Sequence, residues 1–114
     1  MKYRELINPN IAKKLSNTLF KDTKISLAIL KYVDVLYKNL QYLNKEIEKV
    51  NNSEQTREEK ISNINQLLDA EIVEKMPVIL IDYSDFENSI SSTDESNWLS
   101  GTEIRDIVNY FNER

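Results

Sequence analysis

The stretch from Ile25 to Val50 constrains the fold most, because it carries an unbroken helical repeat of apolar residues. The repeat alternates steps of four and three along Ile29, Val33, Leu36, Leu40, Leu43, Ile47 and Val50. This spacing puts the apolar side chains on one stripe of an α-helix that packs lengthwise against another helix. Neither Gly nor Pro interrupts the stretch. We therefore predict one long helix, capped by Asp22 or Thr23.

Two shorter helices are predicted on either side of the long one. Asn8 and Pro9 supply an N-cap and a first helical position, so a short amphipathic helix should cover residues 9–20. Thr56 and Glu59 have the spacing of a capping box that opens another helix, whose apolar residues match the seam of the long helix. Because only a short polar turn separates these two helices, we predict an antiparallel helical hairpin.

The apolar pattern changes after residue 70. Pro77 stops a helix and Val78–Ile81 is a β-branched apolar run, so we predict a strand at about 77–82. Residues 71–76 are the candidate for a second, edge-like strand. Residues 84–97 are polar and acidic and are predicted to form a loop.

A closing helix is predicted after this loop. Ser100 and Glu103 have the spacing of a capping box, and Leu99 and Ile104 are placed for a hydrophobic staple. The predicted fold class is α+β and mostly α. It comprises a short N-terminal helix, a long antiparallel helical hairpin, a small β element and a closing C-terminal helix. At 114 residues we expect a single domain over residues 1–114.

Composition argues against catalysis and metal binding. The sequence contains no Cys and no His. Thiol catalysis, thiolate metal sites, the commonest metal ligand and the commonest general base are therefore missing together. We expect a protein that is not an enzyme and that uses no cofactor or metal. No apolar run approaches the length of a membrane span, so no membrane partner is expected.

Charge is distributed unevenly along the chain. Residues 1–25 hold six Lys or Arg and two Asp or Glu, whereas residues 61–114 hold three and eleven. A basic end and an acidic end either form a polar recognition surface or attract each other within the fold. The net charge of −4 argues against binding to duplex nucleic acid. The acidic half could instead occupy the basic groove of a partner.

The predicted binding surface is the segment from Ser84 to Trp98 with the start of the closing helix. Its candidate residues are carboxylates around aromatic anchors: Asp85, Phe86, Glu87, Asp94, Glu95 and Trp98. Carboxylates would speed the encounter with a basic partner, and an aromatic anchor would supply affinity. The alternatives are a solvated acidic loop without a role and, for Trp98, a staple onto the closing helix. The carboxylate spacing does not fit a calcium-binding loop.

Several segments together resemble a known family. They are Tyr3–Ile11, the long helical middle, Leu67–Ile72, Pro77, Ser84–Glu87 and the closing helix. They are similar to a family of small proteins from phages and prophages of low-GC Gram-positive bacteria, whose members have no established activity. This chain departs from the family in a shorter loop between the helices and a longer, more polar segment from Ser89 to Trp98. The resemblance implies a phage-encoded protein in the cytoplasm of a bacterial host cell.

The expected function is binding. The leading hypothesis is a non-enzymatic, phage-encoded accessory protein that binds and blocks a host macromolecule, such as a defence factor. The alternatives are a structural or assembly protein of the virion and a sponge for a nucleotide-like signal molecule. The partner is expected to be a host or phage protein. Leu27, Leu30 and Val35 lie off the seam, so a homodimer through the long helix is also expected.

Overall fold

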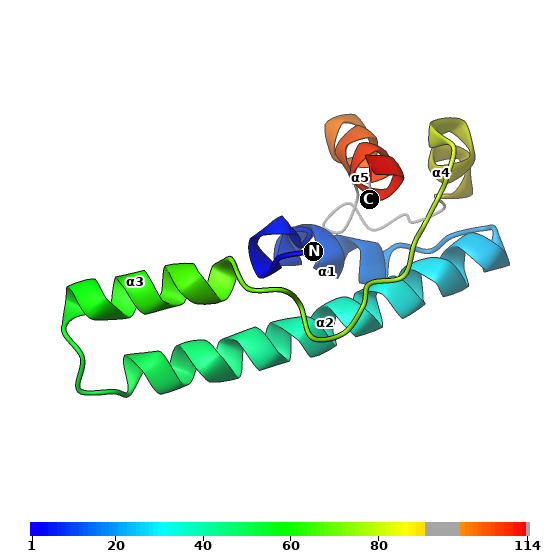
Figure 1. The fold of residues 1–114 in the computed structure, drawn as a ribbon. Helices are drawn as coiled ribbons and strands as arrows, with labels where there is room; N and C mark the ends of the chain where they lie inside the picture. Colours follow the sequence, from blue (N-terminus) through cyan, green and yellow to red (C-terminus); the bar gives the residue numbers. More distant parts are fainter. Residues whose placement is uncertain (91–98, 114) are drawn as a thin grey trace. The chain divides into compact units, whose positions relative to one another are not determined.

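The computed structural model describes residues 1–90 and 99–113 (Figure 1). Its elements are the 3-10 turn η1 (Tyr3–Glu5) and the helices α1 (Pro9–Asn17), α2 (Thr23–Asn51), α3 (Arg57–Leu68), α4 (Tyr83–Ser89) and α5 (Gly101–Glu113). None of the helices in these residues combines the length and apolar character needed to span a lipid bilayer.

The chain divides into two compact units, which are described separately. The hairpin unit consists of Met1–Leu6 and Asp34–Met76, and the C-terminal unit consists of Ile7–Val33 and Pro77–Arg114. Helix α2 contributes its first part to the C-terminal unit and its second part to the hairpin unit.

The predicted helix starts are confirmed by their caps. The Asn8 side chain accepts a hydrogen bond from the Asn10 N–H at 2.8 Å, and Pro9 is the first residue of α1. The Thr56 hydroxyl accepts from the Glu59 N–H at 3.2 Å at the start of α3. These side chains satisfy N–H groups that have no partner inside the helix, so each fixes where its helix begins.

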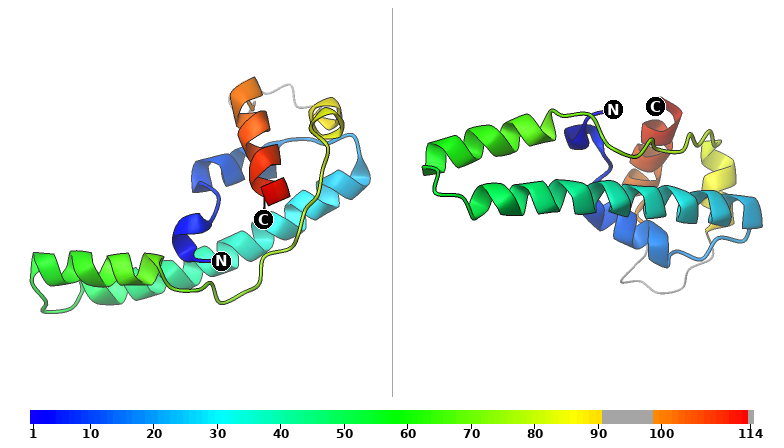
Figure 2. Two further views of the ribbon diagram at one scale, coloured as in Figure 1. Left: turned by 45° about the horizontal axis from the view of Figure 1, so that its top comes forward. Right: turned by 60° about the horizontal axis from the view of Figure 1, so that its bottom comes forward.

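In the hairpin unit, α3 runs antiparallel beside the second part of α2, as Figures 1 and 2 show. Leu36 and Leu43 of the predicted seam are buried, and Leu40 is half-buried. No residue of α3 is fully buried, and Ile61 remains 51% exposed. The hairpin therefore forms as predicted, but the α3 half of its seam stays partly open to solvent.

The core of the C-terminal unit is built from α1, α2, α4 and α5. Its central side chains are all buried: Leu15, Phe20, Ile29, Tyr32, Phe86, Leu99, Ile107 and Phe111. Phe20 packs on Phe86 with ring centroids 5.5 Å apart, and Tyr32 meets Phe111 edge-on at 5.0 Å. These aromatic pairs join α2 and the residues before it to α4 and α5.

The predicted β element is wrong, and the fold of the described residues is helical instead of α+β. Within residues 1–90 and 99–113 there is no strand, and the only β-type contacts are isolated bridges between Lys2 and Glu71 and between Phe20 and Ile90. The expected strand at 71–76 is reduced to the first of these bridges.

The expected strand at 77–82 is an extended segment with no neighbouring strand in the described part of the chain. Val78 and Leu80 are 68% and 76% exposed, whereas Ile79 between them is 9% exposed, the alternation of an extended chain. The backbone of Ile81 is bound by the side chain of Asn112, whose amide takes the place of a neighbouring strand. The apolar run therefore lies extended as predicted, but no second strand is present in residues 1–90 and 99–113 to pair with it.

The loop predicted for residues 84–97 is also corrected, because Tyr83–Ser89 form α4. Asp82 caps this helix: its carboxylate accepts hydrogen bonds from the N–H groups of Ser84 and Asp85 at 2.8 and 3.4 Å. Asp82 lies at the end of the predicted strand, so the cap that starts α4 falls outside the residues from which the loop was inferred.

Candidate functional site

The structure separates the predicted site residues. Asp85 and Glu87 are exposed on α4, whereas Phe86 between them is fully buried against Phe20. Phe86 thus belongs to the core of the C-terminal unit and presents no aromatic anchor at its surface. Asp94, Glu95 and Trp98, the other candidates, lie outside the described residues.

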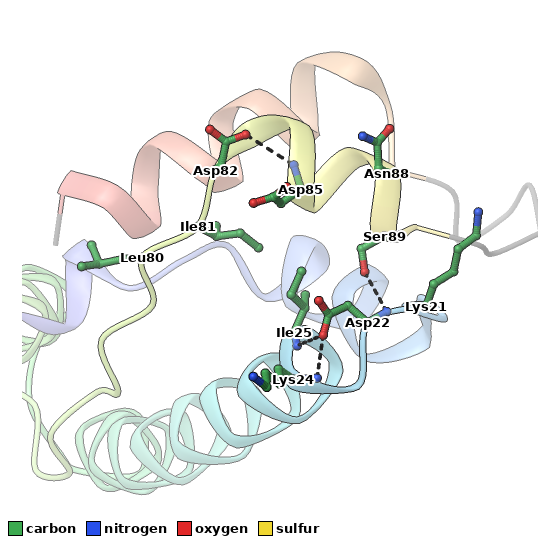
Figure 3. Close-up of a pocket in the computed structure, with 10 residues that line it drawn as sticks. All are labelled: Lys21, Asp22, Lys24, Ile25, Leu80, Ile81, Asp82, Asp85, Asn88 and Ser89. Carbon is green, nitrogen blue, oxygen red and sulfur yellow. Dashed lines mark hydrogen bonds between the residues drawn. The ribbon is translucent and has the colours of Figure 1, made fainter.

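Asp85 instead lines a groove between the start of α2 and the segment that leads into α4 (Figure 3). One part of the groove has a volume of about 630 Å³ and is lined by Lys21, Asp22, Lys24, Ile25, Leu80, Ile81, Asp82, Asp85, Asn88 and Ser89. A second part of about 190 Å³ shares Lys24, Ile25, Leu80 and Ile81 and continues over Ala28, Ile29 and Ile79. We call the two parts together the groove.

Three polar side chains of the groove are engaged in holding its walls. The Asp22 carboxylate caps α2 by accepting from the N–H groups of Lys24 and Ile25 at 2.8 and 3.4 Å. Ser89 accepts the N–H of Asp22 on its hydroxyl at 3.2 Å and the N–H of Lys21 on its carbonyl at 2.6 Å. Together with the Asp82 cap of α4, these bonds fix the start of α2 against α4.

Four other polar side chains of the groove neither cap a helix nor join its walls. Lys21, Lys24, Asp85 and Asn88 are all exposed, and their side chains form no ion pair or hydrogen bond within the described part of the chain. The unengaged charge therefore consists of two ammonium groups and one carboxylate.

The floor and one rim of the groove are apolar. Ile25 and Ile81 approach each other from α2 and from the extended segment and are half-buried. Leu80 forms the rim and is 76% exposed, and Val78 beside it is 68% exposed. Together the two side chains form a small exposed apolar surface beside the groove.

The arrangement offers binding chemistry, and we see no catalytic or metal-binding constellation in the described residues. No group of three or more Asp or Glu in residues 1–90 and 99–113 is placed to hold a metal ion. The hydroxyl of Ser89, a possible nucleophile by residue type, accepts the backbone N–H of Asp22 and has no general base bound to it in the described residues. Its contact is structural.

Sequence reasoning missed most of this site. It interpreted Val78–Ile81 as a strand, and the useful signal was that no second convincing strand exists to pair with it. None of Tyr32, Tyr37 and Tyr42, which recur at five-residue spacing on α2, lines the groove. Tyr32 is buried, while Tyr37 and Tyr42 are 40% and 42% exposed on the hairpin unit.

Comparisons with protein-family models, with curated proteins and with solved structures find no match to this chain. The resemblance to phage and prophage proteins stays a prediction, and so does the homodimer through α2, on which Leu27 and Leu30 are 61% and 52% exposed.

Proposed function

We propose that the protein is a non-enzymatic binding protein that holds a segment of another protein in the groove of its C-terminal unit. The observation that carries this proposal is the groove's composition. An apolar floor at Ile25 and Ile81 lies beside an exposed leucine at position 80 and two unengaged lysines.

The chemistry of the partner segment follows from these residues. An apolar side chain of the partner would cover Ile25 and Ile81, removing their remaining surface from water. A carboxylate beside it could pair with Lys21 or Lys24, the two positive charges of the groove that nothing in the described chain neutralises. The third unengaged charge, the carboxylate of Asp85, belongs to α4 on the other wall. We therefore propose a segment that carries an apolar residue next to an acidic one.

A protein segment suits the groove better than a small anion. Pockets for small molecules enclose most of their ligand, whereas the rim here is an exposed leucine. Three carboxylates, those of Asp22, Asp82 and Asp85, line the same groove as the two lysines. A polyphosphate carries several negative charges, and the two lysines could neutralise at most two of them beside these carboxylates, which disfavours a sponge for a nucleotide-like signal molecule.

In the phage setting that the resemblance implies, we propose that the partner is a host macromolecule, which the bound protein blocks. The second candidate is a role in virion assembly. It is favoured by the extended apolar segment Val78–Ile81, since exposed segments of this kind also join subunits permanently. The two roles differ in whether the partner comes from the host or from the virion.

Site-specific photo-crosslinking tests the proposal. A photoreactive amino acid replaces Leu80 in one variant and Leu30 in a control, and each is expressed during phage infection. Leu30 is also exposed and lies on α2, but it does not line the groove. We expect one protein, other than a second copy of this chain, crosslinked through position 80 and not through position 30. Mass spectrometry assigns it to the host or to the virion, and equal yields of this protein at both positions would contradict the groove as the binding site. A crosslink from position 30 to a second copy would report the predicted homodimer through α2.

A further inference from the structure

The extended segment at the rim of the groove has backbone groups that are unpaired within the described residues, as well as exposed apolar side chains. The N–H and C=O groups of Val78, Ile79 and Leu80 form no hydrogen bond within residues 1–90 and 99–113. Polar backbone groups beside exposed apolar side chains are a template for a further strand. The feature is distinct from the groove's floor, because it concerns the main chain alone.

The side of the segment that is free can be deduced from Asn112. In an extended chain, the N–H and C=O of one residue point to the same side, and those of the next residue point to the opposite side. The backbone of Ile81 points toward α5, where Asn112 binds both of its groups at 3.1 and 3.0 Å. The backbone groups of Val78 and Leu80 therefore point to one shared side, opposite to that of Ile81.

We propose that the partner segment is extended and adds to the backbone of Val78 and Leu80 as a β-strand. This inference rests on the proposed function and specifies how the groove's ligand binds. Main-chain hydrogen bonds to these two residues would align the segment, while its side chains would alternate between solvent and the apolar floor. Its acidic residue would then pair with Lys24, which lines the groove together with Ile79, Leu80 and Ile81.

A second copy of the chain fits this edge less well. Pairing of the two short segments alone, residue for residue, would cover only a few side chains, far below the roughly 1,000 Å² that a stable interface needs. Each copy would offer only one groove carboxylate without a capping role, that of Asp85, against Lys21 and Lys24 of the other copy. A foreign segment of suitable sequence avoids both problems.

Selection from a random 12-residue peptide display library tests the inference. The library is selected against the full chain, and the selected peptides are assayed on the Leu80→Glu variant and on the control Leu30→Glu. Each peptide that loses binding only to Leu80→Glu is then resynthesised with one backbone nitrogen methylated at a time. N-Methylation removes a donor and keeps the side chain.

If the bound peptide is a β-strand, the effect of N-methylation on binding should repeat every two residues. Methylation at alternate positions should weaken binding by about tenfold, because each affected nitrogen loses a hydrogen bond, with small effects between them. Selected peptides should also combine an apolar with an acidic residue. Peptides that depend on the groove but lack this two-residue repeat would contradict binding as a β-strand, while the proposed function would still hold.

Two further outcomes also decide against the inference. A selection that yields no peptide sensitive to Leu80→Glu would contradict both strand addition and its premise, which is that a protein segment binds in the groove. The crosslinking experiment shows independently whether a partner binds in the groove. A dimer of the parent chain that Leu80→Glu dissociates, measured by sedimentation, would assign the edge to a second copy.

Discussion

The side-chain amide of Asn112 binds both backbone groups of Ile81. The Ile81 N–H donates to Asn112 Oδ1 at 3.1 Å, and Asn112 Nδ2 donates to the Ile81 carbonyl at 3.0 Å. One residue of α5 thereby positions the extended segment that forms a wall of the groove. The same arrangement recurs in the hairpin unit, where the fully buried Asn39 binds the N–H and C=O of Glu74, each at 2.8 Å.

We predict that Asn112→Ala loosens the extended segment without unfolding the protein. Both hydrogen bonds are exposed, so their loss should cost about 1 kcal/mol of unfolding free energy. The amide hydrogen of Ile81 should exchange with solvent faster, as measured by NMR. Asn109→Ala is the matched control, since Asn109 is exposed on the same helix. Unchanged exchange at Ile81 would show that the amide does not hold the segment.

Asn39→Ala should be more damaging. Asn39 is fully buried, so its removal leaves the Glu74 backbone groups without partners and opens a cavity beside Met76. We expect a loss of about 3 kcal/mol in urea denaturation, against less than about 0.5 kcal/mol for the exposed control Asn44→Ala. A similar effect of the two substitutions would contradict the structural role of Asn39.

Phe86→Ala should destabilise the C-terminal unit. Phe86 is fully buried on Phe20, and truncation of a buried phenylalanine typically costs about 3–4 kcal/mol. A melting temperature equal to that of the parent would contradict its place in the core. The expected loss also means that weakened partner binding by this variant cannot be attributed to a surface contact.

Glu103 should make stability depend on pH. A hydrogen bond from Lys14, with Nζ 2.8 Å from Oε2, lowers the pKa of Glu103, and the N–H of Ser100 contributes further. Because the pKa is lower in the folded state, this stabilisation is complete above the unfolded pKa and is lost as pH falls through the folded pKa. Glu103→Gln should cost about 1 kcal/mol at pH 7 and little at pH 2–3. An equal cost at both pH values would contradict the charge-dependent origin.

Much of the helical framework could be predicted from the sequence, because helix starts and seams depend on local spacing. The capping box of Ser100 and Glu103 forms with bonds of 3.0 and 3.1 Å, and Leu99 and Ile104 beside it are both buried. Caps of this kind involve residues three positions apart, so sequence alone contains both partners.

The extended segment and the groove could not be predicted in the same way. Whether Val78–Ile81 pairs with a strand or with Asn112 depends on a contact between residues 31 positions apart. The burial of Phe86 likewise depends on Phe20, which lies far away in the sequence. Local patterns identify an extended apolar run or a polar, acidic segment, but they do not contain the residue that it meets.

The most direct test of the central claim is the affinity of the purified crosslinked partner for three forms of the protein. Leu80→Glu places a charge at the rim of the groove, while Leu30→Glu makes the same change at an exposed leucine that does not line it. We predict that Leu80→Glu raises the Kd about tenfold or more, whereas Leu30→Glu changes it less than about twofold. Equal Kd values for the parent and Leu80→Glu, with both proteins folded, would contradict binding in the groove.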